Sequence, residues 1–178
     1  DNAPYVVGAA GQNGYADVIS PPTTRPLQLG DVLMLDTGCV WDGYFCDFDR
    51  NWGIGRADDD ARRAYNVLWR ATEMGIDTAR PGATCRDLFE AMSAVIMELD
   101  KSGGDIGRLG HGLGMQLTEQ PSHAAFDTTE LKENMVLTIE PSLSYGNGLM
   151  MVHEENIVVS DGAPRLLSTR APADLMLI

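Results

Sequence analysis

Two stretches of the chain repeat the same pattern of apolar residues and end in the same type of side chain. Residues 27–36 and residues 131–140 align without a gap at an offset of 104 residues. Each stretch is a short apolar run that ends in a carboxylate, Asp36 in the first and Glu140 in the second. An apolar run of this length bounded by turn residues is typical of a strand. The repeat therefore predicts two similar hairpins, one near each end of the chain.

Each stretch continues through a glycine-containing turn to a second carboxylate, Asp47 in the first and Glu154 in the second. One histidine, His111, lies between the two repeats in the glycine-rich segment 104–114. Carboxylate oxygens and an imidazole nitrogen suit divalent Mn, Fe, Co or Zn. Four carboxylates carry about four negative charges, which offset two dications that lie ~3.5–4 Å apart and share a bridging water. The pattern predicts a pseudo-symmetric site for two metal ions.

Each of these residues alone is weak evidence, because a strand-end acid such as Asp36 commonly serves only as a turn or cap residue. The duplication is what raises the joint significance of the set. Alternation along a strand also separates neighbouring acids, since adjacent side chains face opposite sides. It places Glu154 and Glu155 on opposite faces, and Asp47 and Asp49 on the same face.

Strands at both ends of the chain and helices between them indicate an α+β fold. Apolar periodicity, turn dipeptides and helix caps give the expected elements. The expected strands are residues 32–35, 45–52, 135–139 and 149–159, the expected helices are 57–79 and 85–99, and residues 11–30 form a Gly/Pro-rich loop.

Composition limits the class of protein further. At 178 residues the chain fits one domain, and its net charge of -13 argues against a nucleic-acid or anionic-membrane partner. No apolar run reaches the ~20 residues of a transmembrane helix. Three cysteines without metal-type spacing favour a reducing, cytoplasmic setting, and a bond between Cys39 and Cys46 is not expected. Because the chain begins at Asp1, we expect a further segment to precede it.

Five short motifs, taken together, resemble the pita-bread metallopeptidase family, which includes aminopeptidase P, prolidase and methionine aminopeptidase, with creatinase as a metal-free relative. The motifs occur in the family's order, and the resemblance covers nearly the whole chain. They are Asp36-Thr-Gly, Asp42-Gly-Tyr-Phe-Cys-Asp47, Gly110-His111-Gly-Leu-Gly114, Thr138-Ile-Glu140-Pro141 and Glu154-Glu-Asn-Ile157. The resemblance implies a pita-bread fold, with curved pseudo-twofold sheets backed by helices, in which residues 1–178 form a single catalytic domain that is incomplete at its N-terminus.

The same resemblance implies a role for each matched residue. Asp36 would chelate one metal, Asp47 and Glu154 would bridge both, and His111 and Glu140 would complete the second metal's ligands. Glu140 would also accept a proton from the metal-activated water that attacks an amide carbonyl. The cofactors implied are two divalent ions, Mn, Co, Zn or Fe, with Mn favoured. A short peptide or small amide substrate and a homodimeric assembly are also implied.

Two positions depart from the peptidase pattern. The peptidases carry a histidine where this chain has Ile19, and another where it has Thr118. Those histidines help to bind substrate and to stabilise the transition state. We expect Thr118 to lie near substrate, and His153 and His123 are candidates to replace a lost imidazole. Alternation along the strand points His153 away from Glu154, so a half-buried strand histidine is its competing interpretation.

Three functions follow from these motifs and departures. The first is an Xaa-Pro peptidase of the aminopeptidase P or prolidase type. The second is a metal-dependent hydrolase or lyase that acts on a small non-peptide metabolite, since Ile19 and Thr118 replace both accessory histidines. The third is a binding module without catalysis, against which the retention of all five ligand residues argues.

Overall fold

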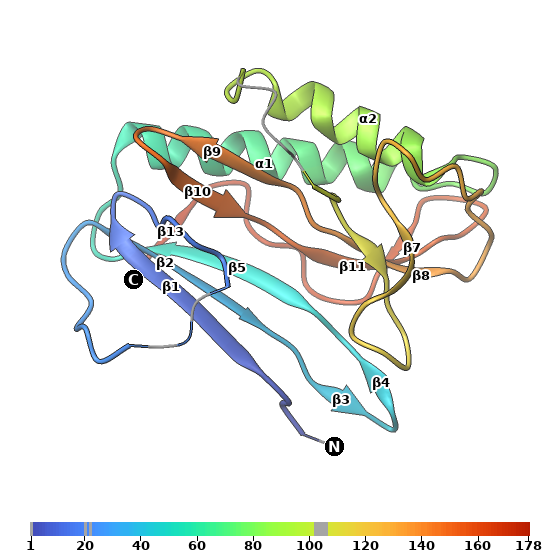
Figure 1. Cartoon of the computed structure of the whole chain (residues 1–178), viewed down its shortest axis with the longest axis horizontal. Helices are drawn as coiled ribbons and strands as arrows, with labels where there is room; N and C mark the ends of the chain where they lie inside the picture. Colours follow the sequence, from blue (N-terminus) through green and yellow to red (C-terminus); the bar gives the residue numbers. More distant parts are fainter. Residues whose placement is uncertain (1, 20, 22, 102–106) are drawn as a thin grey trace.

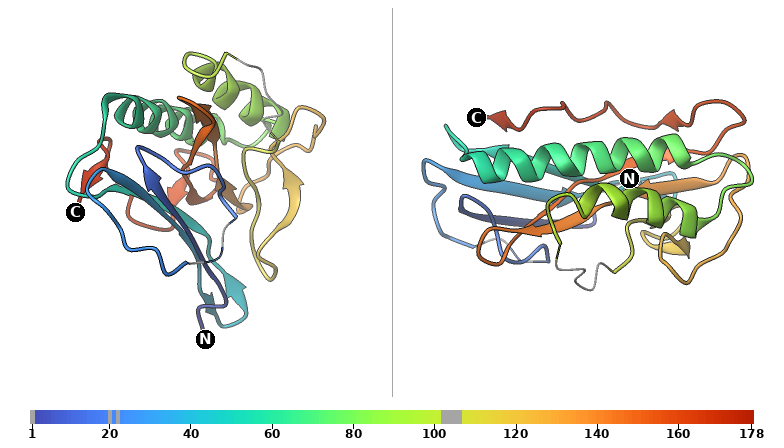
Figure 2. Two further views of the ribbon diagram at one scale, coloured as in Figure 1. Left: turned by 60° about the vertical axis from the view of Figure 1, so that its left-hand side comes forward. Right: turned by 90° about the horizontal axis from the view of Figure 1, so that it is seen from above.

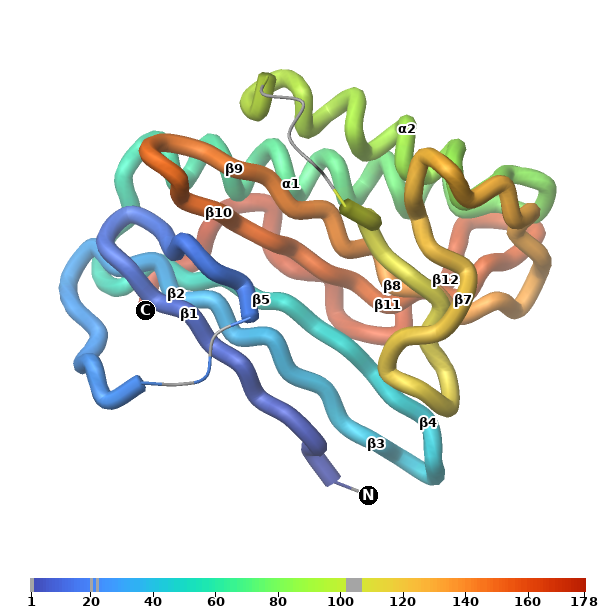
Figure 3. The backbone as a smooth tube through the Cα atoms, viewed as in Figure 1, coloured from blue at the N-terminus to red at the C-terminus, as the bar shows by residue number. Residues whose placement is uncertain are grey.

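The computed structural model describes residues 2–19, 21, 23–101 and 107–178, and it has the expected α+β architecture. Figure 1 shows the two helices on one side of the molecule and the strands beneath them. Each expected repeat forms a long hairpin, and the two hairpins are seen as separate continuous traces in Figure 3. The site described below lies where the two hairpins meet.

The first hairpin belongs to a four-stranded sheet in the order β1-β2-β5-β13. The strands of this sheet are β1 (Val6–Gln12), β2 (Asp31–Thr37), β5 (Phe48–Gly53) and β13 (Met176–Leu177), and β2 and β5 are the arms of the hairpin. The hairpin tip is a separate pair, β3 (Val40–Trp41) and β4 (Tyr44–Phe45). Asp42 and Gly43 between them have φ values of 49° and 84°, as a tight turn with two left-handed residues requires.

The second hairpin repeats this arrangement. Its strands are β8 (Val136–Ile139), β9 (Ser142–Tyr145), β10 (Leu149–Val152) and β11 (Glu155–Val158). The strands β9 and β10 pair at the tip, and β8 and β11 belong to a five-stranded sheet in the order β12-β11-β8-β6-β7. The remaining strands of that sheet are β6 (His111–Gly112), β7 (Glu119–Ser122) and β12 (Arg165–Leu166).

Two helices cover the second hairpin. In α1 (Asp59–Thr78), the side chain of Asp58 caps the first turn by accepting from the backbone N–H of Ala61. In α2 (Cys85–Ile96), Thr84 and Asp87 form a reciprocal capping box. Figure 2 shows the helices side by side, with the C-terminal segment along the other flank of α1. Neither described helix is both long and apolar enough to cross a membrane.

A single apolar core joins the helices to the second hairpin. Its largest fully buried side chains include Leu68 of α1, Leu88 and Met92 of α2, and Leu137 and Ile139 of β8. Because tight packing of this kind resists displacement, the strands of the second hairpin are held against the helices.

The structure corrects two expected strands and one helix end. The return strands expected at 45–52 and 149–159 are each interrupted, at residues 46–47 and residues 153–154, and α2 ends at Ile96 rather than near residue 99. Each strand interruption contains one of the matched carboxylates, Asp47 or Glu154. The expectation of free cysteines holds: Cys39 and Cys46 are unbonded, with their Sγ atoms 3.3 Å apart.

Candidate metal centre

The five residues matched by sequence converge on one place between the two hairpins. Asp36 lies near the end of β2 and Asp47 directly before β5, so the first hairpin supplies two carboxylates. Glu140 follows β8 and Glu154 precedes β11, so the second hairpin supplies two more. His111 begins β6, which lies beside β8. Each acid lies at or beside a strand end, where the ladder stops and a side chain can turn inward.

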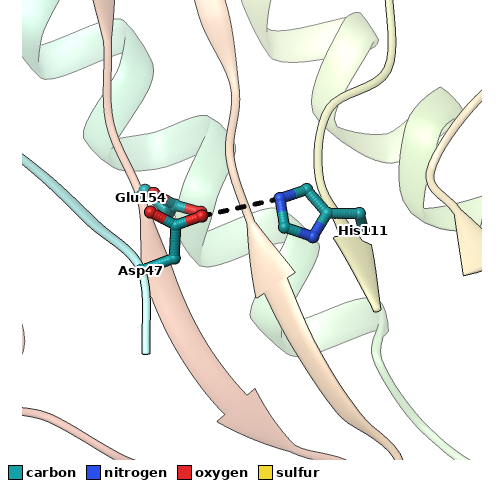
Figure 4. Close-up of side chains that lie close together, drawn as sticks. All are labelled: Asp47, His111 and Glu154. Atoms are coloured by element: carbon teal, nitrogen blue, oxygen red, sulfur yellow. Dashed lines mark ion pairs between the residues drawn. The ribbon is translucent and has the colours of Figure 1, made fainter. Parts of the chain in front are cut away.

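The imidazole of His111 faces the carboxylates, as Figure 4 shows. Its Nε2 lies 3.8 Å from Asp47 Oδ2 and 3.7 Å from Glu140 Oε2. Its Nδ1 lies 2.8 Å from the carbonyl oxygen of Gly112, which can only accept, so Nδ1 carries the hydrogen. The Nε2 lone pair is therefore directed into the cluster. This is the tautomer and orientation of a typical metal-ligating histidine.

The local chain path explains how His111 reaches this place. Gly110 has a φ of 132°, and a Cβ built there would lie 2.3 Å from the carbonyl oxygen of Thr138 and 2.6 Å from the His123 ring. Only glycine fits so close an approach at positive φ. The backbone N–H of His111 then donates to Thr138 Oγ1 at 3.1 Å, which fixes β6 against β8.

The cluster contains two groups of three ligand atoms, and within each group all the atoms lie within 4.8 Å of one another. One group consists of Asp47, His111 and Glu154, and the other of Asp36, Asp49 and Glu154. Glu154 belongs to both. One carboxylate is therefore common to two groups that could each hold a metal ion.

The buried acids of the cluster lack the partners that buried charges normally have. Among the described residues, Asp36 Oδ1, Asp49 Oδ1 and Glu154 Oε1 are buried without a hydrogen-bond partner. Burial, followed by repulsion from Asp47, raises the pKa of Asp36 to about 6 and that of Glu140 to about 7. Burial also raises the pKa of Asp49 and Glu154 well above their usual range. A cluster of charges this poorly compensated fits residues that bind divalent cations.

The fold adds supporting residues that sequence patterns alone did not indicate. Tyr5, at the start of the chain, donates its hydroxyl hydrogen to Asp47 Oδ1. The amide of Asn156 pairs with both backbone groups of Asp47, accepting from its N–H at 3.0 Å and donating to its carbonyl. Arg50 donates to the carbonyl oxygen of Glu154 at 2.6 Å. The contacts of Asn156 and Arg50 join the two hairpins at Asp47 and Glu154.

The expectation that His153 contacts substrate is not supported, because its ring faces away from the cluster. Its Nδ1 lies 3.0 Å from Thr72 Oγ1 of α1, and its ring packs edge-on against Tyr65. His123 is also buried, and its Nε2 donates to the carbonyl oxygen of Thr138 at 2.9 Å. Ile19 is 78% exposed, and Thr118 is exposed in the loop between β6 and β7. His111 is therefore the one histidine of this chain whose ring faces the carboxylates.

The raised pKa values of the four acids named above predict a pH dependence of stability when divalent cations are absent. Each acid keeps its proton to higher pH when folded than when unfolded, so the free energy of unfolding falls as pH rises through that interval. Burial lowers the pKa of all three histidines. Their titration makes the free energy of unfolding rise with pH, but only below about pH 6.5, the usual pKa of histidine.

We therefore expect chelator-treated protein to lose stability between about pH 6.5 and 8, where the acids alone titrate. Added Mn²⁺ should restore the loss by neutralising the carboxylates. Urea unfolding at several pH values, with chelator or with Mn²⁺, measures both effects. A metal-free protein that is equally stable at both ends of this interval would contradict the burial of four ionisable acids in one cluster.

Comparison of the sequence with known proteins identifies related metallopeptidases. A family model described as metallopeptidase family M24 matches residues 4–161. The Xaa-Pro dipeptidase of Pyrococcus furiosus is 30% identical over 146 residues, which cover 82% of this chain and 42% of the relative. The putative dipeptidase YkvY of Bacillus subtilis is 33% identical over 161 residues, which cover 88% of this chain and 43% of the relative. The chain thus spans less than half the length of these curated relatives.

Solved structures match over almost the whole chain. The dipeptidase PepE from Mycobacterium ulcerans superposes with a TM-score of 0.87 at 28% identity, covering 98% of this chain and 47% of that protein. A prolidase from Thermococcus sibiricus superposes with a TM-score of 0.88 at 26% identity, covering all of this chain and 48% of that protein. These matches confirm the pita-bread fold.

Proposed function

The chain belongs to metallopeptidase family M24, and from this premise we propose that it forms the catalytic part of a dinuclear metal-dependent hydrolase of the Xaa-Pro peptidase type. The observation that carries the proposal is that Asp36, Asp47, His111 and Glu154 fall into two groups that share Glu154, with Glu140 Oε2 3.7 Å from His111 Nε2. Relatives named Xaa-Pro dipeptidase support the substrate class. In this proposal residues 1–178 act as one catalytic domain.

The proposed ligands divide between two ions. Asp36 would hold one ion, His111 and Glu140 would hold the other, and Asp47 and Glu154 would serve both. When bound, such ions polarise a carbonyl and lower the pKa of water so that a nucleophile exists at neutral pH. The carboxylate-rich ligand set suits Mn²⁺, with Co²⁺, Zn²⁺ and Fe²⁺ as alternatives.

Glu140 has the exposure that a proton acceptor needs. Its side chain is 28% exposed, compared with 10% for Asp47 and 2% for His111. Solvent and substrate can therefore reach Glu140, whereas the other two lie beneath it. Glu140 accepts the proton of the attacking water and returns it to the leaving amine, the usual pair of steps for a carboxylate in amide hydrolysis.

Hydrolysis of a proline-containing peptide tests the proposal directly. Protein loaded with Mn²⁺ is expected to cleave Ala-Pro or Gly-Pro-Pro, with activity lost on chelation and regained when Mn²⁺ is added back. Chromatographic detection of the released amino acid measures the rate. If metal-loaded protein cleaves none of these peptides, the Xaa-Pro proposal fails.

A second candidate is a hydrolase or lyase reaction on a small non-peptide metabolite at the same centre. The observation that favours it is the position of the other two histidines. His123 and His153 are hydrogen-bonded to Thr138 and Thr72. Neither therefore replaces the histidines that the peptidases carry where this chain has Ile19 and Thr118. An exposed Thr118 could still contact substrate. This candidate predicts about two bound ions without turnover of Xaa-Pro peptides, and efficient peptide cleavage would exclude it.

We also propose a homodimeric assembly and a cytoplasmic location. Homodimerisation follows from the resemblance to the peptidases, and sedimentation velocity tests it. A cytoplasmic location follows from cysteine usage, and the three unbonded cysteines support it.

A further inference from the structure

Asp49 is an acid in the centre to which the matched motifs assign no role. It is the cross-strand partner of Asp36 in the β2–β5 ladder, and its side chain is directed into the cluster together with Asp36 and Glu154. The residue is 2% exposed. Its Oδ1 has no hydrogen-bond partner anywhere in the described part of the chain. A buried carboxylate that has an unpartnered oxygen and is directed at two other acids is stabilised by a compensating positive charge.

The neighbouring guanidinium forms no direct ion pair with the Asp49 carboxylate. Arg50 follows Asp49 in sequence, but its Nη1 donates to the backbone carbonyl oxygens of Asp49 and Glu154, at 2.9 and 2.6 Å. Its Nη2 donates to Glu155 at 3.0 Å. None of these bonds reaches the Asp49 carboxylate. An ion pair between Asp49 and Arg50 therefore does not explain why an acid occupies this position.

The two groups of the centre differ in chemistry because His111 belongs to only one of them. The group of Asp47, His111 and Glu154 offers a nitrogen and oxygens, which suit Zn²⁺, Co²⁺ and Fe²⁺. The group of Asp36, Asp49 and Glu154 offers only carboxylate oxygens, which suit Mn²⁺ and Mg²⁺.

We propose that Asp49 is a ligand of the ion held by Asp36 and Glu154, and that this additional carboxylate strengthens the preference of the oxygen-only position for hard cations such as Mn²⁺ over Zn²⁺. The inference rests on the dinuclear centre proposed above and adds a fifth carboxylate to it. Two dications already offset the charge of the four other carboxylates, and Asp49 adds one more negative charge. The additional charge favours cations that bind mainly by electrostatic attraction. The two ions are therefore expected to bind with different preferences.

Titration of the metal alone separates this inference from the proposed function. Chelator-treated full chain is titrated calorimetrically with MnCl₂ and, separately, with ZnCl₂, for the original protein, Asp49→Asn and Asp49→Ser. In both variants the affinity for Mn²⁺ at the oxygen-only site is expected to fall ~10-fold or more. Binding of the first Zn²⁺ ion, at the group containing His111, is expected to change much less. Asp161→Asn removes an exposed acid outside the cluster and is the matched control.

The outcomes are distinct. Original protein and Asp49→Asn that bind Mn²⁺ equally would overturn the inference and leave the dinuclear centre standing. Equal loss of both ions would also overturn it, because Asp49 would then support the cluster as a whole. Original protein that binds no metal would overturn both proposals. Since the variants remove an uncompensated buried charge, their metal-free melting temperature should equal or exceed that of the original, and failure to fold would mark a structural role instead.

Discussion

Asp47→Asn is expected to bind at most one divalent ion per chain and to hydrolyse substrate ~100-fold to 1000-fold more slowly, the scale of losing one essential electrostatic group at an active site. Asp47 is buried, its Oδ2 lies 3.8 Å from His111 Nε2, and the amide of Asn156 holds its backbone. An asparagine keeps the size of the side chain but removes the charge and one anionic oxygen. Elemental mass spectrometry of protein purified with Mn²⁺ measures the ion count, and a peptide assay measures the rate.

The control for this prediction is Asp161→Asn, which changes an exposed aspartate by the same chemistry. It should retain both ions and full activity. The native fold of Asp47→Asn is checked by its circular dichroism spectrum. A variant that keeps about two ions would show that Asp47 does not bridge the metals, and the ligand assignment would have to be revised.

Glu155→Gln is expected to destabilise the fold by ~3 kcal/mol, because removal of one member of a buried ionic network leaves its partners uncompensated. The Glu155 carboxylate is fully buried and faces away from the cluster. It accepts hydrogen bonds from Arg50 and Arg170, both at 3.0 Å, from the Ser168 hydroxyl at 3.1 Å and from the backbone N–H of Ala171 at 2.9 Å. Glutamine keeps the shape but presents an amide N–H₂ to several donors. Urea unfolding measures the change.

The matched control is Glu133→Gln, an exposed glutamate in the turn before β8. Substitutions at such surface positions usually change stability by less than about 0.5 kcal/mol. Under conditions in which Glu155→Gln is folded, its metal content should remain close to that of the original protein. A loss of stability below about 1 kcal/mol would mean that the arginines find other partners and that the network does not anchor the C-terminal segment.

The comparison of Glu154 with Glu155 shows how far local reasoning extends. Glu154 lies in the interruption before β11 and Glu155 begins that strand, and the two side chains face opposite sides, as alternation predicts. Glu154 enters the cluster, whereas Glu155 binds the two arginines on the other face. The same rule correctly turned His153 away from Glu154, but this histidine is fully buried between two strands, whereas the competing interpretation was a half-buried strand residue. Side-chain alternation follows from backbone geometry alone, and a short sequence is therefore sufficient to predict it.

The strand interruptions and the burial of His123 show where local reasoning fails. Nothing in residues 45–52 or 149–159 marks the points at which the pairing breaks, because these points are set by how the two hairpins meet. His123 follows a Pro-Ser dipeptide typical of an exposed loop, yet it is buried against the carbonyl oxygen of Thr138. Tertiary packing overrides local preference in both cases.

The sequence by itself determined the two hairpins, the helices between them, and the order and spacing of the five matched residues. Each of these depends on periodicity and turn chemistry within a few tens of residues. Only the tertiary structure decided that Tyr5 reaches Asp47, that Asn156 holds Asp47 across 109 residues of sequence, and that Asp49 joins the cluster. Contacts between such distant residues depend on how two separately formed hairpins pack against one core, and a local pattern does not encode that packing.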